Sequence, residues 1–242
     1  MNSLDKKKFV IKNKDFLENL NSDEIIEFVC KNVRDKKLFS TSFGSEDQVL
    51  THKIATTNRD IEIFTLDTGR HFSETYHVHA QTLDKYKILI KTYAPDHLDI
   101  EKLLSEKGPE SFFLSIENRK ECCYLRKVKP LQRALRGQNL WVTGIRRQQS
   151  SDRLQLPVIE YDEDHDIIKV HPLINWSDSE LWNYIRENNI PTNALHKKGF
   201  LSIGCAPCTR AVSDGEDFRA GRWWWEENTH KECGLHLHRA NK

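Results

Sequence analysis

The chain has 242 residues, and its 37 lysines and arginines nearly balance 36 aspartates and glutamates, for a formal net charge of +1. This balance excludes the overall basic excess of a general nucleic-acid binder. No apolar run approaches the roughly 18–20 residues of a membrane span. The lysine-rich start has no apolar stretch behind it, unlike a secretory signal. We therefore expect a cytoplasmic protein that binds neither nucleic acid nor membrane; its oligomeric state, including a homo-oligomer, stays open.

Strand and helix patterns alternate along the chain. Residues 1–15 lack periodicity, so we expect a loosely ordered arm there. Asn21 and Glu24 then predict a capping box at the start of a helix. Beyond it, strands are predicted near residues 38–42, 61–66, 86–93 and 139–143. Helices are expected near residues 46–57, 72–84, 97–107 and 122–135.

Two shorter β-like segments follow, and Ser177 with Glu180 predicts a second capped helix. Strands separated by helices of this length predict βαβ units, hence an α/β fold with a mostly parallel twisted sheet flanked by helices. Ligands of such sheets bind at the carboxyl ends of the strands. We expect one domain over residues 16–242, with a core to about residue 175 and a C-terminal extension of loops and short helices over about 176–242.

The first predicted strand ends in a short polar turn that contains Ser42, Gly44 and Ser45. Exposed backbone N–H groups at a strand-to-helix turn can bind an anion, but an ordinary capped turn fits the same residues. The turn matches neither a P-loop nor a dinucleotide fingerprint. Asp67, at the end of the next strand, could accept hydrogen bonds from a nucleoside, although a plain turn also explains it.

Four cysteines occur as two close pairs, Cys122 with Cys123 and Cys205 with Cys208. Four thiolates suit zinc or an iron–sulfur cluster. Structural zinc sites usually use C-x₂₋₄-C spacing, for which a directly adjacent pair is awkward. The pairs therefore favour a [4Fe–4S] cluster.

Cys233 stands apart from both pairs, close to the end of the chain. A lone cysteine beside lysine and histidine can be a nucleophile of lowered pKa. It can equally be a metal ligand, because His230, His236 and His238 lie near it in the sequence. A tail thiol without function is the third interpretation, and the residues alone leave all three open.

Arginines follow two of the predicted loops. Arg146 and Arg147 come just after the fourth strand, and Arg219 and Arg222 precede three consecutive tryptophans. Guanidinium groups bind phosphate and sulfate through paired hydrogen bonds. Solvated surface arginines are the alternative, and we weigh the two interpretations about equally.

Together these stretches resemble the assimilatory adenylylsulfate reductases of the phosphoadenylylsulfate reductase family. The resemblance covers about residues 39–236. It depends on the motifs CCYLRKVKPL, TGIRRQQS, IGCAPCTRAV, GEDFRAGRWWWE and KECGLH, supported by LDTGRHFSETY. It implies an adenine-nucleotide α-hydrolase-like fold and a cytoplasmic oxidoreductase of sulfate assimilation. That enzyme releases sulfite and AMP from adenosine 5′-phosphosulfate, with thioredoxin as the reductant.

The resemblance also implies roles for individual residues. Cys122, Cys123, Cys205 and Cys208 would ligate one [4Fe–4S] cluster, and Cys233 would be the nucleophile that forms an S-sulfonate intermediate. Lys127 would lie near both cluster and substrate. Arg219, Arg222 and His236 would lie near the phosphosulfate. Because no thioredoxin-like segment follows Cys233 in this sequence, the reductant is expected to be a separate protein.

One departure concerns the turn from Ser42 to Asp47, which is a residue shorter than the Ser-Phe-Ser-Gly-Ala-Glu-Asp form usual in these enzymes. Its length is nearer that of the cluster-free enzymes, so a 3′-phosphoadenosine 5′-phosphosulfate reductase or a dual-substrate enzyme is the alternative. A tRNA-thiolating enzyme or ATP pyrophosphatase of the same fold would show a fuller Ser-Gly-Gly-x-Asp-Ser loop and a basic surface. A zinc-stabilised binding module, in which Cys233 would be dispensable, is a more remote alternative.

Overall fold

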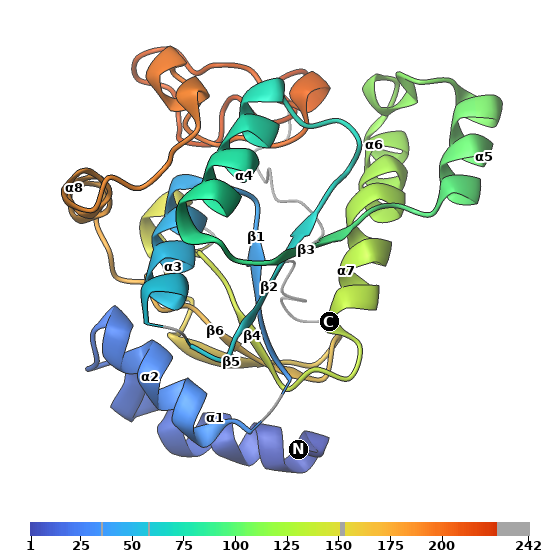
Figure 1. The fold of residues 1–242 in the computed structure, drawn as a ribbon. Coiled ribbons are helices and arrows are strands. Elements are labelled where there is room, and N and C mark those ends of the chain that lie inside the picture. The colour runs from blue at the N-terminus through green and yellow to red at the C-terminus, as the bar shows by residue number, and fades with distance from the viewer. Residues whose placement is uncertain (35, 58, 151–152, 227–242) are drawn as a thin grey trace.

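A mixed sheet forms the centre of the computed structural model, which describes residues 1–34, 36–57, 59–150 and 153–226 (Figure 1). Its strand order is β3-β2-β1-β4-β6-β5. All neighbouring strands are parallel except β5 and β6, which pair antiparallel. The predicted α/β fold with a mostly parallel sheet is therefore confirmed. The strands are β1 (Lys37–Thr41), β2 (Glu62–Leu66), β3 (Ile90–Tyr93), β4 (Leu140–Val142), β5 (Ile159–Asp162) and β6 (Ile167–Val170).

Helices cover both faces of the sheet, with α7 on one face and α2, α3, α4 and α8 toward the other (Figure 1). Side chains alternate across a strand, so Phe39 enters the larger core under α2 and α3, whereas Leu38 enters the smaller core under α7. The helices are α1 (Ser3–Leu17), α2 (Ser22–Asn32), α3 (Ser45–Thr56), α4 (Ser73–Tyr86), α5 (His97–Lys107), α6 (Ile116–Cys123), α7 (Lys129–Leu135) and α8 (Asp178–Glu187).

The N-terminal segment corrects one expectation. Residues 1–15 are not a loosely ordered arm, because Ser3–Leu17 form α1, capped by the Asn2 side chain, which accepts from the Asp5 N–H at 2.8 Å. Val10 and Leu17 are buried, and α1 packs against β5 and β6. Lys6 is also buried, its ammonium donating to the carbonyl of Asp166 at 2.5 Å. Buried lysine stems of this kind weaken the apolar periodicity that would reveal a helix in the sequence.

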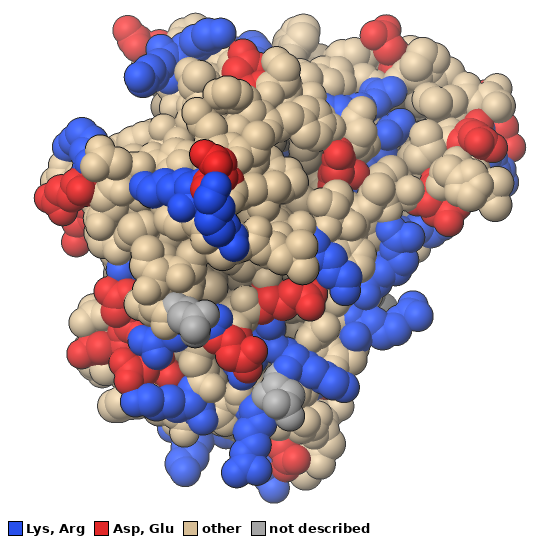
Figure 2. Space-filling model, in the orientation of Figure 1, with Lys and Arg blue, Asp and Glu red and all other residues tan. Residues whose placement is uncertain are grey.

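Local signals in the sequence place most other boundaries well. Both predicted capping boxes are present, at Asn21 with Glu24 and at Ser177 with Glu180. The third strand is shorter than predicted, because α4 continues to Tyr86 and ends at Lys87 in the left-handed conformation, with φ of 51°. Within the described ranges, no helix is long and apolar enough to cross a membrane. Figure 2 shows acidic and basic side chains interspersed on one face, as the balanced composition implies.

Candidate active site

A cavity of about 210 Å³ opens at the carboxyl ends of β1, β2 and β4. It lies where the sequence predicts a ligand site, and six of the predicted site residues line it: Ser42, Gly44, Ser45, Lys127, Arg219 and Arg222. The rest of its wall comes from segments far apart in the sequence. It includes Ser40, Leu66, His71, Thr143, Gly144, Gln149, Arg153, His196 and residues 201–204.

The turn after β1 is held in place by its own side chains. Asp47 accepts from the backbone N–H of Ser42 at 2.6 Å and from its hydroxyl at 2.7 Å. Phe43 has a positive φ of 60°, and its buried ring stacks on His79 with 4.5 Å between ring centroids. Gly44 is the N-cap of α3 and makes no side-chain cap. The first N–H groups of α3 are therefore available to an anion in the cavity.

Burial shifts two titratable groups of the cavity wall. It raises the pKa of Asp47 to about 6, although the two hydrogen bonds from Ser42 act in the opposite direction. Burial, together with the charge of Lys127, lowers the pKa of His71 to about 4. At neutral pH the cavity thus contains a neutral imidazole at His71, while positive charge is supplied by lysine and arginine.

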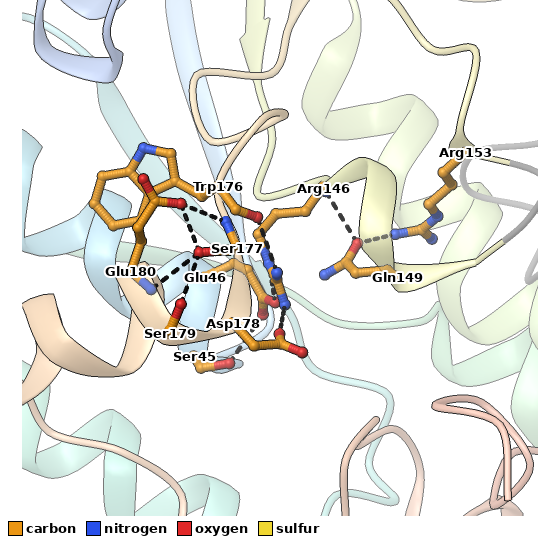
Figure 3. Close-up of polar contacts among 10 residues, drawn as sticks. All are labelled: Ser45, Glu46, Arg146, Gln149, Arg153, Trp176, Ser177, Asp178, Ser179 and Glu180. Carbon is orange, nitrogen blue, oxygen red and sulfur yellow. Dashed lines mark hydrogen bonds and ion pairs between the residues drawn. The ribbon is translucent and has the colours of Figure 1, made fainter.

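Arg146 and Arg147 are not among the residues that line this cavity. The Arg146 guanidinium is buried in an ion-pair network, where it contacts Glu46 at 2.8 Å and Asp178 at 2.5 Å (Figure 3). Arg147 instead forms a salt bridge with Glu18 at 3.1 Å. The structure therefore does not bring either arginine to an anion site. Each cross-links loops of the fold.

Asp67 does not line the cavity either. Its neighbour Leu66 does. The Asp67 carboxylate accepts from the backbone N–H of Gly69 at 2.8 Å and from the Tyr76 hydroxyl at 2.9 Å. In the described residues it shapes the turn after β2, which is the plain interpretation of the Asp-Thr-Gly motif.

Sequence reasoning missed several residues of the cavity. Arg153 and Gln149 lie beyond the Arg-Arg motif, and the Arg153 guanidinium donates to the Gln149 side chain (Figure 3). His71 follows the Asp-Thr-Gly-Arg turn directly, so its place after a strand was a usable signal. His196 lies on the 3₁₀ turn η5 (Ala194–Lys198) and had no such signal.

The four predicted metal ligands lie in one cluster beside this cavity, which we call the thiol cluster: Cys122, Cys123, Cys205 and Cys208. Cys122, Cys205 and Cys208 are buried together with Trp223, and Cys123 packs against them. The first pair ends α6, immediately before the π-helical turn η2 (Tyr124–Val128). In the second pair, Cys205 immediately precedes the 3₁₀ turn η6 (Ala206–Cys208) and Cys208 ends it. The fold thus brings together two pairs that are 82 residues apart, from Cys123 to Cys205.

The thiols of this cluster act on one another and on nearby cations. Burial, with the neighbouring Cys205 and Cys123, raises the pKa of Cys208 to about 12. Burial also acts to raise the pKa of Cys205, but the charge of Lys127 and a 3.3 Å hydrogen bond with the Thr68 hydroxyl outweigh it, so that this pKa is lowered. Lys127 therefore connects the thiol cluster to the cavity, because it also lines the cavity wall.

The donor set tests whether these residues fit a metal group. Four sulfur ligands lie in one apolar cluster, where burial alone disfavours the thiolate form. Lys127 and Arg222 act in the opposite direction at Cys205, so a negatively charged centre held by these cysteines would have cations beside it. Among the described residues, no three His, Cys, Asp or Glu side chains are arranged to hold a single metal ion. Cys233 and His236 lie outside the described residues, so the structure gives no position for either.

Comparison with known protein families identifies the family of this chain. The family model for the phosphoadenosine phosphosulfate reductase domain matches residues 36–211, most of the chain. This chain belongs to that family. The predicted family membership is confirmed. The predicted adenine-nucleotide α-hydrolase-like fold is confirmed as well.

Curated relatives of this reductase-family chain carry a more specific name. The adenosine 5′-phosphosulfate reductase of Allochromatium vinosum is 47% identical over 88% of this chain and 83% of its own length. The protein of the same name from Neisseria meningitidis serogroup B is 48% identical over 82% of this chain and 81% of its own length.

Solved structures agree with the assignment to the reductase family. The phosphoadenylyl-sulfate reductase of Candida auris, in complex with phosphate, is 29% identical with a TM-score of 0.73, over 85% of this chain and 97% of that one. A flavin mononucleotide adenylyltransferase of Candida glabrata is 16% identical, with a TM-score of 0.51, over 89% of this chain and 74% of that one. The second likeness shows a shared fold and nothing about the reaction.

Proposed function

We propose that this chain reduces adenosine 5′-phosphosulfate to sulfite and AMP in the cytoplasm, with a separate thioredoxin as reductant. The names and identities of its relatives support the substrate. The observation that carries the proposal is the position of Lys127, which lines the cavity and acts on the thiol cluster behind it. That arrangement places a cation where the cavity meets the thiol cluster, which suits a negatively charged substrate.

The cavity wall provides the contacts that a phosphosulfate needs. The free N–H groups at the start of α3 and the side chains of Lys127, Arg153, Arg219 and Arg222 surround the anion. Arg222 is buried, its guanidinium lies 4.8 Å from the centre of the Trp223 ring, and it donates to the Ser202 hydroxyl at 3.4 Å. A guanidinium held in this way keeps a fixed direction toward its ligand. By its place in the family motif, His236 is proposed to join them.

Cys233 is proposed as the nucleophile. Its thiolate attacks the sulfur of the substrate and forms an S–S bond, while the bond from sulfur to the phosphate oxygen breaks and AMP leaves with the electron pair. A thioredoxin thiolate then attacks the Cys233 sulfur, so that sulfite leaves with its electron pair and a mixed disulfide remains. The second thioredoxin cysteine resolves this disulfide. Thioredoxin is oxidised by two electrons, and the sulfur is reduced to sulfite.

We propose that the thiol cluster binds one [4Fe–4S] centre, which would contribute fixed charge and local order next to the substrate. The direct adjacency of Cys122 and Cys123 supports a cluster over zinc, because structural zinc sites usually use C-x₂₋₄-C spacing. Lys127 and Arg222 would balance the negative charge of that centre. Iron and sulfide analysis of anaerobically purified protein tests this assignment, and stoichiometric zinc without sulfide would overturn it.

Sulfite release tests the proposed reaction directly. Purified protein is incubated with adenosine 5′-phosphosulfate, reduced thioredoxin and thioredoxin reductase, and sulfite and AMP are measured together. Equal amounts of both products support the proposal. Without thioredoxin, intact-mass spectrometry should show an adduct of one SO₃ on the protein. AMP release without that added mass would contradict the covalent route.

A further inference from the structure

A buried hydrogen-bond chain runs from the cavity wall into the sheet. The hydroxyl of Thr143, which follows β4, lies 2.6 Å from Nδ1 of His171, which follows β6. Nε2 of His171 lies 3.3 Å from a carboxylate oxygen of Glu160 in β5, and Lys169 contacts the same oxygen at 3.1 Å. His171 is fully buried. The chain crosses three neighbouring strands, in the order β4-β6-β5.

Thr143 is buried, its side chain lies on the α7 face of the sheet, and it is a lining residue of the cavity. Side chains alternate along β4, so Thr143 shares a face with Trp141, which is in the core under α7. Ser40 in β1 and Leu66 at the end of β2 are on this same face, and both line the cavity with Thr143. The Trp141 ring N–H donates to the Ser40 hydroxyl at 2.9 Å, which ties these strand ends together.

The partners of His171 fix the direction of the Thr143 hydroxyl. The Glu160 carboxylate, paired with Lys169, can only accept a hydrogen bond, so Nε2 of His171 carries the hydrogen. Because Lys169 already neutralises the Glu160 carboxylate, we assign the neutral ring to His171, and its Nδ1 is then an acceptor. The Thr143 hydroxyl therefore donates to Nδ1, and its oxygen presents only lone pairs to any other partner.

We infer that Thr143 accepts a hydrogen bond from a ribose hydroxyl of the bound nucleotide, and that His171 and Glu160 are positioning residues for it. The ribose is the part of the nucleotide within reach of Thr143. The next residue, Gly144, packs against the turn after β1, where the phosphosulfate is proposed to bind. A Cβ on Gly144 would lie 2.3 Å from the Asp47 carboxylate. In a nucleotide, the sugar is attached directly to the phosphate. The inference rests on the proposed function for the identity of this nucleotide.

Binding of the product AMP tests the inference without any catalytic step. Calorimetry would compare AMP with 2′-deoxyAMP and 3′-deoxyAMP on the purified protein. Wild-type protein should bind AMP roughly 10-fold tighter than one of the two deoxy analogues, because the missing hydroxyl leaves the Thr143 oxygen unpaired. Thr143→Val should lose most of this preference, whereas Thr143→Ser should keep it.

Thr65→Val is the matched control. Thr65 is a buried threonine on β2, two strands from β4 in the sheet. Its hydroxyl has no hydrogen-bond partner among the described residues, and it is not a lining residue of the cavity. Thr65→Val makes the same exchange of a hydroxyl for a methyl group inside the sheet, but away from the cavity. It should therefore retain the preference for AMP over the deoxy analogues. A comparable loss in Thr65→Val and Thr143→Val would show that the effect comes from packing, and it would overturn the inference.

His171 supplies the second test. His171→Leu removes the acceptor that orients Thr143 and should weaken the preference for AMP, while His171→Asn, whose amide oxygen can accept from Thr143, should restore part of it. An unchanged preference in Thr143→Val, or none in the wild type, overturns the inference. Sulfite release is measured on the same wild-type preparation. If sulfite is released but the preference is absent, the inference about Thr143 fails and the proposed function stands.

Discussion

Arg146 and Glu46 form a buried ion pair across the cavity-forming segments, with the Arg146 Nε atom 2.8 Å from the Glu46 carboxylate. Glu46 belongs to the first turn of α3, and its other carboxylate oxygen accepts from the Ser45 hydroxyl at 3.0 Å. The same guanidinium donates to the carbonyl of Trp176 at 3.1 Å, just before α8 (Figure 3). One arginine thus connects the start of α3 to the start of α8, more than 120 residues further along the chain.

We expect Arg146→Gln to lower the free energy of unfolding by about 3–5 kcal/mol, because it leaves the Glu46 carboxylate buried without its ion-pair partner. Urea unfolding followed by circular dichroism measures this loss. Arg186→Gln is the control: Arg186 is exposed on α8 and contacts only Asn183 among the contacts described, so its loss should stay within about 0.5 kcal/mol. Similar losses in both variants would mean that the buried pair contributes nothing specific.

The raised pKa of Asp47, about 6, predicts a defined dependence of stability on pH. Between about pH 4 and pH 6, the unfolded chain has already released this proton, whereas the folded chain retains it. Raising the pH through this range therefore favours unfolding. The stability that the folded chain gains by holding this proton is fully lost above about pH 6. The free energy of unfolding of wild type relative to Asp47→Asn should fall as pH rises from 4 to 6. Asp217→Asn, at an exposed carboxyl, should show no such trend.

Gly144 approaches the turn after β1 more closely than any side chain permits. A Cβ at this position would lie 2.3 Å from the Asp47 carboxylate and 3.3 Å from its backbone nitrogen. Gly144→Ala should therefore displace the turn and weaken AMP binding by roughly 10-fold or more. In Gly108→Ala, the added Cβ meets nothing within 4 Å and strains only a backbone with φ of 79°. That control should lose some stability and keep its affinity for AMP in calorimetry.

Features encoded by neighbouring residues could be predicted from the sequence. The capping boxes at Asn21 and Ser177 depend on residues three positions apart, and the alternation of strands and helices follows from hydrophobic periodicity. The polar turn between β1 and the helix that follows it was predicted for the same reason. The α1 helix escaped prediction because buried Lys6 interrupts its apolar pattern.

Long-range partners could not be predicted in this way. Nothing near Arg146 in the sequence shows that Glu46, exactly 100 residues earlier, occupies its guanidinium, so an arginine next to a strand end was interpreted as an anion ligand. The clustering of the two cysteine pairs was expected from their ligand chemistry and from the family resemblance. The Thr143–His171 hydrogen bond had no local signal, because its two residues meet only through the pairing of β4 with β6.

Cys233→Ser should abolish sulfite release and leave the visible absorption of the proposed iron–sulfur centre unchanged, because Cys233 lies outside both cysteine pairs. Cys205→Ser should lose both properties. Cys30→Ser is the control. Cys30 lies on α2 and packs against the large core, away from the thiol cluster, so this variant should keep both properties. Sulfite assays and absorption spectra of anaerobically purified variants give the answer. Loss of the visible absorption in Cys233→Ser would instead indicate that Cys233 is a ligand of the centre.

The cations of the cavity bear on the choice between the two phosphosulfate nucleotides. A 3′-phosphate adds close to two negative charges, which need cations beyond those that hold the phosphosulfate. Among the described residues, the cations in the cavity wall are Lys127, Arg153, Arg219 and Arg222. Arg146 and Arg147 are held by carboxylates elsewhere, so neither adds to this set.

We therefore expect kcat/KM to be higher for adenosine 5′-phosphosulfate than for its 3′-phosphorylated relative. A missing charge partner should cost about 1.5–3 kcal/mol, or roughly 10–100-fold in kcat/KM. The relatives named for the unphosphorylated substrate, at 47–48% identity, point the same way. The short turn from Ser42 to Asp47 is the counter-argument, because its length shapes the space beside the sugar. Sulfite release from each nucleotide at one fixed thioredoxin concentration decides the matter: an equal or reversed ratio would show that the turn outweighs the charge deficit.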